Sequence, residues 1–208
     1  MKIAVCQVNP IVGDFSYNVN KVQTYYDRAI QSGAELVIFP EMVVCGYPPQ
    51  DLIWENGFVS ACERSIQTIA SFSKIPLIAG FIRKEKNKLY NSAALCTNGK
   101  VAFIYDKMLL PTYDVFDEDR YFTPGKNVGV TEVEIAGKLK KIGIQICEDL
   151  WDMDYELKVT NELAQRGAQM IINISASPFH DEQPQIRKTL IEQKVRETKT
   201  HFIYCNLV

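Results

Sequence analysis

Residues 139–149 read LKKIGIQICED, an apolar run that ends in a cysteine followed directly by two acidic residues. The run predicts a strand, with the cysteine at the point where the strand leaves the core. The same design occurs in VIFPE at residues 37–41 and in FIYDK at residues 103–107. Active sites of α/β proteins collect at the carboxyl ends of strands. The side chains that these three ends present are Cys147, Glu41 and Lys107.

Around these runs, short apolar segments alternate with helical patterns, which predicts an α/β fold. Strands are expected over residues 2–8, 35–39, 75–82, 91–96, 101–105, 128–135, 139–147, 169–175 and 201–208. Helices are expected over residues 18–32, 58–72, 156–165 and 184–200. In the last helix, the side chains expected to face the core are Ile186, Leu190, Ile191 and Val195. A turn at residues 97–100 joins two strands as a hairpin, so the sheets should be mixed rather than wholly parallel.

One long segment, residues 106–126, interrupts this alternation with prolines, a glycine and mixed charges and aromatics. We predict an ordered loop here, and long loops in compact domains are usually functional.

The composition is that of an ordinary globular domain, and the 208 residues are predicted to form one domain, 1–208. The formal net charge is −2 and no basic stripe stands out, so nucleic acid is not expected as a partner. No apolar run is long enough for a membrane span, and the N-terminus lacks a signal-peptide pattern. We therefore expect no membrane partner and a cytoplasmic location.

The six cysteines form no CxxC pair and do not cluster with the two histidines, so no metal site is expected. They are Cys6, Cys45, Cys62, Cys96, Cys147 and Cys205. Because several lie in apolar strand-like runs, the default prediction is buried free thiols in a reducing compartment. Cys147 is the exception that the strand-end pattern singles out.

A carboxylate, an ammonium and a thiol together suit the cleavage of a carboxamide. A thiol attacks an amide carbonyl poorly unless a base removes its proton, and Glu41 could be that base. Glu41 could then pass the proton to the leaving amine. Lys107 and a backbone N–H just after Cys147 could hold the developing oxyanion.

Each of these residues also has a plain structural interpretation that spacing alone leaves open. Cys147 could be a structural thiol, and the acidic pair after it could form a surface turn. Glu41 could be a solvated turn residue or a charge at a helix N-terminus. Lys107 could simply be exposed in a polar loop.

Three short motifs resemble those of the nitrilase, or carbon–nitrogen hydrolase, superfamily. Phe39-Pro40-Glu41 resembles its glutamate motif, residues 105–107 its lysine motif, and residues 146–149 its cysteine motif. The resemblance covers residues 2–208 and keeps the Glu, Lys, Cys order of the family's triad. It implies a four-layer α-β-β-α sandwich of two mixed sheets, and a base (Glu41), an oxyanion and positioning residue (Lys107) and a nucleophile (Cys147).

Longer strings resemble one branch, the glutaminase domain of glutamine-dependent NAD⁺ synthetases. They are KMLLPTYDVFDEDRYF at residues 107–122, CEDLW at residues 147–151 and NISASPFH at residues 173–180. The resemblance implies L-glutamine as substrate, with the ammonia passed to an ATP-using domain that amidates deamido-NAD⁺. It also implies homo-oligomers, because family members pair through a helical layer.

The same branch implies a set of substrate contacts. Tyr113 matches a tyrosine that contacts glutamine, and Ser177 a serine that holds the amino-acid end of the substrate. Glu148 would lie beside the substrate and offer its backbone N–H to the oxyanion. Glu118 would be a second acidic residue near the triad. From the residues alone, Tyr113 could instead be a packing aromatic and Ser177 a turn residue.

Gln183 departs from the branch pattern. It falls six positions after Ser177, where a Lys or Arg is expected. This difference bears on how the carboxylate of the substrate is held, and Arg187 or Lys188 could substitute.

Length is the other departure. The resemblance implies further strands of this domain, and then a synthetase domain, after residue 208. No GxxxxGK or SGGxDS-like phosphate loop occurs in the sequence. We therefore expect no cofactor in this chain, and assign ATP, Mg²⁺ and deamido-NAD⁺ to the synthetase domain. Two alternatives remain: a free-standing amidase acting on another small amide, and a non-catalytic assembly module.

Overall fold

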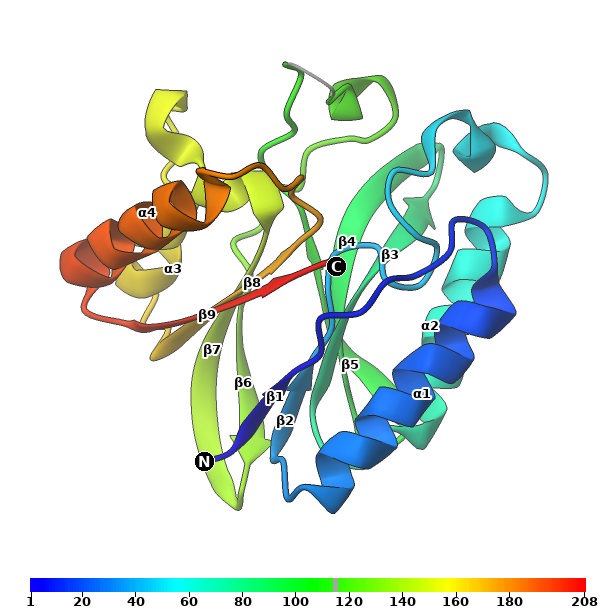
Figure 1. The fold of residues 1–208 in the computed structure, drawn as a ribbon, viewed down its shortest axis with the longest axis horizontal. Coiled ribbons are helices and arrows are strands. Elements are labelled where there is room, and N and C mark those ends of the chain that lie inside the picture. The colour runs from blue at the N-terminus through cyan, green and yellow to red at the C-terminus, as the bar shows by residue number, and fades with distance from the viewer. Residues whose placement is uncertain (114–115) are drawn as a thin grey trace.

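The computed structural model describes residues 1–113 and 116–208. Two β-sheets face each other, and a pair of helices covers the outer face of each (Figure 1). The result is a four-layer α-β-β-α sandwich, which confirms the expected fold. Part of the loop string at residues 107–122 that favours glutamine, residues 114–115, lies outside the described residues.

The first sheet has the strand order β1-β2-β3-β4-β5. Its strands are β1 (Ile3–Val5), β2 (Leu36–Ile38), β3 (Leu77–Glu85), β4 (Lys88–Thr97) and β5 (Lys100–Asp106). Strands β1 to β3 run parallel, whereas β3, β4 and β5 are joined by antiparallel pairing. The sheet is therefore mixed, as the turn at residues 97–100 predicts.

The second sheet has the order β6-β7-β8-β9. Its strands are β6 (Val130–Ile135), β7 (Lys138–Ile146), β8 (Met170–Ser175) and β9 (His201–Asn206). Strand β6 pairs antiparallel with β7, and β7, β8 and β9 run parallel. The carboxyl ends of β7 and β8 therefore lie at the same edge of this sheet, and Cys147 follows the first of them.

Helices α1 (Phe15–Gln31) and α2 (Phe58–Phe72) cover the first sheet, while α3 (Val159–Gln165) and α4 (Gln183–Thr198) cover the second (Figure 1). The described residues also include four short 3₁₀ helices: η1 (Gln50–Trp54), η2 (Glu118–Arg120), η3 (Cys147–Leu150) and η4 (Asp152–Asp154). Among the described residues, none of the helices combines the length and apolarity that crossing a lipid bilayer requires.

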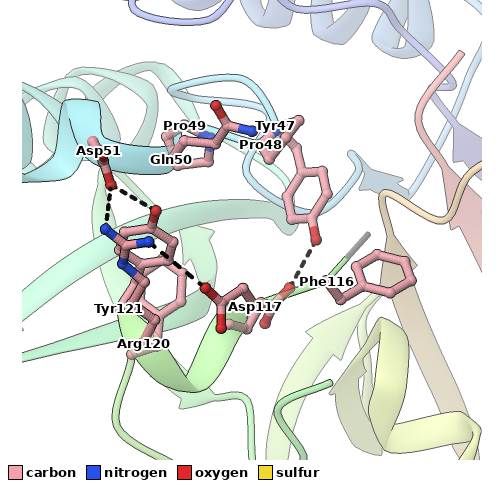
Figure 2. Close-up of a pocket in the computed structure, with 11 residues that line it drawn as sticks. Tyr47, Pro48, Pro49, Gln50, Asp51, Phe116, Asp117, Arg120 and Tyr121 are labelled. Carbon is pink, nitrogen blue, oxygen red and sulfur yellow. Dashed lines mark hydrogen bonds and ion pairs between the residues drawn. The ribbon is translucent and has the colours of Figure 1, made fainter. Parts of the chain in front are cut away.

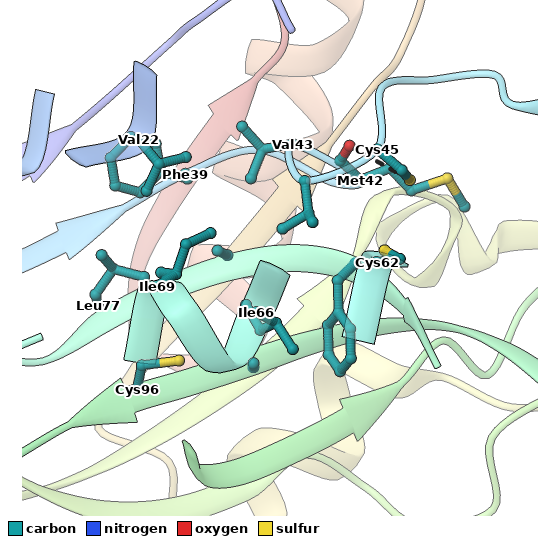
Figure 3. Packing of buried hydrophobic residues seen from close by; sticks show 14 of the residues in the cluster. Val22, Phe39, Met42, Val43, Cys45, Cys62, Ile66, Ile69, Leu77 and Cys96 are labelled. Carbon is teal, nitrogen blue, oxygen red and sulfur yellow. Dashed lines mark hydrogen bonds between the residues drawn. The ribbon is translucent and has the colours of Figure 1, made fainter. Parts of the chain in front are cut away.

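The position of strand β2 between two cores explains why its sequence is continuously apolar. Leu36 and Ile38 point into the core between the two sheets, whereas Val37 points into the core under α1 and α2. All three side chains are fully buried, because the strand is covered on both faces. In the helix-side core, Val22 of α1 and Leu77 of β3 pack in one cluster with Cys62, Ile66 and Ile69 of α2 (Figure 3).

Helix α4 departs from the prediction. Ile186, expected to face the core, is 43% exposed, whereas Lys194 of the same helix is buried. The Lys194 ammonium lies 2.6 Å from a carboxylate oxygen of Asp152 in η4. An ion pair and Leu190 thus fix the inner face of α4, which a search for apolar spacing does not detect.

Several element ends also differ from the sequence prediction. The strand expected over residues 2–8 covers only Ile3–Val5, the three residues that pair with β2. The helix expected over residues 156–165 begins at Val159. The preceding Lys158 ammonium donates to the backbone carbonyls of Asp152 and Met153 and so keeps this segment out of the helix.

Gly80 of β3 lets the chain around Glu41 approach the sheet. A Cβ atom added at Gly80 would lie 2.6 Å from the Cα of Glu41 and would also collide with the backbone N of Met42. Overpacking of this kind against backbone costs about 1–3 kcal/mol. Because the added Cβ meets backbone atoms, which cannot move aside, we expect Gly80→Ala to lower the free energy of unfolding by about 3 kcal/mol or more, measured by urea denaturation.

Gly33→Ala is the matched control, because a Cβ there meets nothing within 4 Å and φ is +76°. It should cost only the left-handed backbone penalty of about 1–2 kcal/mol. Equal or smaller destabilisation by Gly80→Ala would contradict the close approach.

Candidate active site

Glu41 and Lys107 form a buried ion pair. The Lys107 Nζ lies 3.0 Å from Oε1 of Glu41, and the two side chains are 0% and 1% exposed. Glu41 follows β2 and Lys107 follows β5, so two strand ends of the first sheet converge here. The interpretations of Glu41 as a solvated turn residue and of Lys107 as an exposed loop residue are both wrong.

Glu118 of η2 is the second carboxylate on the same ammonium. Both of its carboxylate oxygens lie 2.9 Å from Lys107 Nζ. The Tyr47 hydroxyl donates to Glu118 Oε1 at 3.0 Å, and the Asn91 amide donates to Glu41 Oε1 at 2.7 Å. The bonds that Glu118 makes with Lys107 and Tyr47 hold the long loop against the first sheet.

Glu41 also connects the two sheets. Its Oε2 accepts the backbone N–H of Ala176, just after β8, at 2.7 Å. One carboxylate oxygen therefore faces Lys107, and the other is held by the second sheet. Because both oxygens have fixed partners, the carboxylate has a fixed orientation.

Lys107 remains protonated in this setting. Burial alone would lower the pKa of its ammonium, but the charges of Glu118 and Glu41 outweigh burial and hold the pKa well above its ordinary value. Burial raises the pKa of Glu118, against the opposing charge of Lys107, and the charge of Glu41 adds to the rise. One ammonium thus faces two carboxylates. Lys107, Glu41 and Glu118 together carry an excess of one negative charge, which one additional proton would neutralise.

Cys147 occupies a sharp bend between β7 and η3. Its φ is +42°, in the left-handed region that non-glycine residues rarely adopt and that costs about 1–3 kcal/mol. The bend turns the thiol out of the strand direction. Burial and then the charge of Glu41 raise the pKa of the thiol, against the opposing charge of Lys107. The resting sulfur is therefore a neutral thiol.

Asp149 holds the bend in place. Its Oδ1 accepts the backbone N–H groups of Met108 and Leu109, at 3.1 and 2.9 Å. Its Oδ2 accepts the backbone N–H of Ile146 at 2.9 Å and the Tyr105 hydroxyl at 2.8 Å. The carboxylate thus joins the segment after Lys107 to the bend at Cys147. The acidic surface turn that the sequence left open is wrong, because Asp149 is fully buried.

A pocket of about 330 Å³ opens onto Cys147. The residues that line it are Tyr113, Phe116, Cys147, Glu148, Trp151, Ser177, Pro178, His180 and Gln183. All four residues expected to contact substrate, Tyr113, Glu148, Ser177 and Gln183, therefore line the same pocket as Cys147. Glu148 accepts hydrogen bonds from the hydroxyls of Tyr113 and Tyr155, at 2.9 and 3.1 Å. Gln183 Nε2 lies 3.5 Å from the Ser177 hydroxyl.

The two basic residues after Gln183 have other contacts. The Lys188 ammonium is exposed and lies 4.0 Å from Glu192. The Arg187 guanidinium lies 4.7 Å from the centre of the Tyr204 ring. Neither residue is among those that line the Cys147 pocket in the described part of the chain.

A second pocket, of about 350 Å³, is lined by residues of the same loop and by residues 47–51 (Figure 2). Asp51 joins its two walls, because it accepts from the Tyr121 hydroxyl at 2.7 Å and pairs with Arg120 at 3.4 Å. Glu118 and Tyr47 also line this pocket. Phe116 lines both pockets, so the loop that carries Glu118 borders both cavities.

Sequence patterns missed several residues of the site. Asn91, Tyr47 and Tyr155 each donate to a carboxylate of the site, yet none follows a strand as a lone reactive side chain. In residues 1–113 and 116–208, no group of three or more His, Cys, Asp or Glu side chains is arranged to hold a metal ion.

The chain belongs to the carbon–nitrogen hydrolase family, whose model matches residues 2–195. Among curated relatives, it is 36% identical to the glutamine-dependent NAD(+) synthetase of Synechocystis sp., over 99% of this chain and 39% of that protein. It is 34% identical to the synthetase of the same name from Thermotoga maritima, over 100% of this chain and 35% of that protein. The chain thus spans well under half the length of these relatives.

Solved structures agree with the fold. The glutamine-dependent NAD⁺ synthetase of Acinetobacter baumannii, in complex with ADP, superposes with a TM-score of 0.90 at 29% identity, over 99% of this chain and 38% of that chain. An amidase from Nesterenkonia sp. superposes with a TM-score of 0.82 at 23% identity, over 100% of this chain and 76% of that one. The amidase likeness supports the fold alone.

Asp149 provides a test of how the bend is held. In Asp149→Asn, one oxygen is replaced by an NH₂ group that faces two hydrogen-bond donors. Leaving buried donors without an acceptor costs about 1–3 kcal/mol each. We therefore expect a loss of about 2–6 kcal/mol in the free energy of unfolding, measured by urea denaturation, and slower alkylation of Cys147, measured by peptide mass.

The control variant is Asp51→Asn, which changes an exposed carboxylate that also accepts a tyrosine hydroxyl. Asp51→Asn should change neither the free energy of unfolding nor the rate of Cys147 alkylation appreciably. Unchanged Cys147 alkylation in Asp149→Asn would contradict the role assigned to this carboxylate.

Proposed function

We propose that this chain hydrolyses L-glutamine to glutamate and ammonia through a thioester on Cys147. One observation carries the proposal. Cys147 shares a pocket with Tyr113, Glu148, Ser177 and Gln183, and the charges of Glu41 and Lys107, which form a buried ion pair, both act on its thiol. The pocket and the ion pair support the assignment of Cys147 as nucleophile, Glu41 as base and Lys107 as the cation of the site.

In the first half-reaction, Glu41 takes the proton of the thiol as the sulfur attacks the carboxamide carbon. The oxygen of the resulting tetrahedral species becomes negative and is stabilised by Lys107 and the backbone N–H of Glu148. The C–N bond then breaks, and Glu41 returns its proton to the leaving nitrogen, which departs as ammonia. A thioester between Cys147 and the glutamyl group remains.

In the second half-reaction, water attacks the thioester carbon. Glu41 accepts a proton from the water, and the same donors hold the second oxyanion. The C–S bond breaks, the sulfur regains the proton and glutamate leaves. Each half-reaction thus returns Glu41 to the carboxylate that starts the next one.

The charges of the site favour a base-assisted attack over a preformed thiolate. Burial and the Glu41 carboxylate raise the pKa of Cys147, which keeps the sulfur protonated before substrate binds. Lys107 balances only one of its two carboxylates, so a proton moving onto Glu41 relieves repulsion between Glu41 and Glu118. The proton transfer therefore stabilises the site as negative charge appears on the substrate.

Glutamine fits the polar groups of the pocket. We assign Glu148, held by two tyrosine hydroxyls, to the α-ammonium of the substrate, and Tyr113 and Ser177 to its amino-acid end. Gln183 would offer an amide N–H to the carboxylate of the substrate, where the related branch uses a cation. The relatives at 36% and 34% identity carry glutamine in their names, which supports this choice.

The wider role we propose is ammonia supply to a synthetase domain of the same protein. That domain would use ATP and Mg²⁺ to amidate deamido-NAD⁺, in a cytoplasmic homo-oligomer. The support is the match along essentially the whole of this chain to proteins named glutamine-dependent NAD⁺ synthetase.

Ammonia release from glutamine, followed with a coupled assay, tests the proposal. Cys147→Ala should abolish release because no thioester can form. Glu41→Gln should lower the rate about 100-fold or more, which is the usual worth of a general base. Cys96→Ala is the control, because this buried cysteine packs in the helix-side core and should leave the rate unchanged.

Substrate choice separates glutaminase from amidase. Glutamine should be cleaved much faster than propionamide or acetamide, which lack the groups that Glu148 and Ser177 would hold. Equal rates on all three amides would instead establish a small-amide amidase. Absence of cleavage by folded parent protein would leave the non-catalytic assembly module.

A further inference from the structure

Glu148 is a buried carboxylate that forms no ion pair with a cation of the described part of the chain. The residue is only 3% exposed. Its Oε1 accepts the Tyr155 hydroxyl at 3.1 Å, and its Oε2 accepts the Tyr113 hydroxyl at 2.9 Å. The buried carboxylate of Glu41, by contrast, pairs with Lys107. Because a buried charge is costly without a partner, the pocket that Glu148 lines favours a ligand that brings a cation.

The other polar groups that line this pocket are neutral donors. Among the described residues of the lining there is no Lys or Arg. The Ser177 hydroxyl and the Gln183 amide lie 3.5 Å apart and can both donate to a carboxylate. A substrate carboxylate would therefore be held by hydrogen bonds from uncharged groups.

The beginning of α4 does not replace the missing cation. A helix N-terminus attracts anions through its free N–H groups. The N–H of Gln183 already bonds the carbonyl of His180 at 3.0 Å. The N–H of Gln185 bonds the carbonyl of Glu182 at 3.1 Å, and Pro184 between them has no N–H. The first three residues of this helix thus leave no free N–H for a carboxylate.

We propose that the pocket recognises only one end of its substrate by charge. The α-ammonium is recognised by the Glu148 carboxylate, whereas the α-carboxyl group is recognised by neutral donors alone. The substrate class is therefore carboxamides that carry an α-ammonium, and it includes glutamine derivatives whose α-carboxyl is blocked as a neutral amide. This inference rests on the proposed glutaminase and widens its substrate class.

Tyr155 fixes the orientation of Glu148. Its ring packs against the apolar cluster that includes Leu163 of α3. Its backbone N–H donates to the carbonyl of Asp152 at 3.2 Å, and the side chain of Asp152 pairs with the buried Lys194 of α4. The hydroxyl that Glu148 accepts is therefore held by both apolar packing and an ion pair. Tyr155 is a positioning residue that acts on the substrate through Glu148.

Three related amides separate the two ends of the substrate. They are L-glutamine, its α-N-methylamide, which has no carboxylate, and glutaramate, which has no ammonium. In the methylamide only the side-chain amide can release ammonia, so a coupled ammonia assay reports the cleavage of one bond. We would compare kcat/KM at about pH 8, where histidine side chains are usually neutral.

The parent protein should cleave the methylamide within about tenfold of glutamine, because hydrogen bonds from neutral donors contribute little more than that. Glutaramate should be cleaved about 30-fold more slowly or worse, because it leaves the Glu148 carboxylate buried without a cation.

Variants at both ends sharpen the test. Glu148→Gln should remove the preference for glutamine over glutaramate. Tyr155→Phe should raise the KM for glutamine about tenfold and leave that for glutaramate unchanged. Gln183→Arg should favour glutamine over its methylamide by about tenfold more than the parent does, because the new cation pairs with the carboxylate. Tyr121→Phe is the control, since it also removes a hydroxyl that donates to a carboxylate, that of Asp51, and should change none of these values.

A parent protein that cleaves glutamine but cleaves the methylamide more than about 100-fold more slowly would overturn the inference, as would equal rates on glutamine and glutaramate. An unchanged KM for glutamine in folded Tyr155→Phe would overturn the role of Tyr155. If that variant does not fold, the loss of preference in Glu148→Gln decides.

Folded parent protein that releases no ammonia from any of the three amides would reject the glutaminase. Calorimetric binding of the same compounds then decides the inference separately. Similar affinities for glutamine and its methylamide, with weaker binding of glutaramate, would support it. Equal affinities for all three, or no binding, would overturn it.

Discussion

The buried ammonium of Lys107 is the interaction on which the site depends. It separates two carboxylates, Glu41 and Glu118, that would otherwise face each other without water. Removing one member of a buried ionic group costs about 3–5 kcal/mol, because the charge left behind is unpaired. The long loop that carries Glu118 is therefore fixed by electrostatics, and that loop forms a wall of both cavities. Catalytic geometry and loop structure thus rely on a single cation.

The site also depends on how the two sheets pack. Glu41 and Lys107 come from the first sheet, whereas Cys147 and the N–H of Ala176 come from the second. Between them lies an apolar cluster that includes Leu36 and Ile38 on one side and Ile144 and Ile146 on the other. A small shift in this packing would move the base relative to the sulfur. Asp149 crosses the same boundary and resists such a shift through three hydrogen bonds, to Tyr105, Met108 and Leu109.

The sequence predicts the reactive strand ends because strand periodicity and residue type are local properties. It also predicts the double-sided burial of β2, since a run without polar residues has no solvent face. Contacts between distant segments are not local, and so Asn91 on Glu41 and Tyr47 on Glu118 could not be predicted. The inner face of α4 was predicted only in part for the same reason: Leu190 is buried, but Ile186 is exposed. Its buried Lys194 has the polarity of a surface residue, and only its pairing with Asp152 explains its position.

The most direct test is intact mass after exposure to an electrophilic glutamine analogue, comparing the parent protein with Cys147→Ala and Lys107→Met. We predict one adduct on the parent and none on Cys147→Ala. On Lys107→Met the adduct should be strongly reduced, because Glu41 is no longer held beside the sulfur and the oxyanion loses its cation. Labelling spread over several cysteines, or a Lys107→Met protein that reacts at the parent rate, would contradict the account.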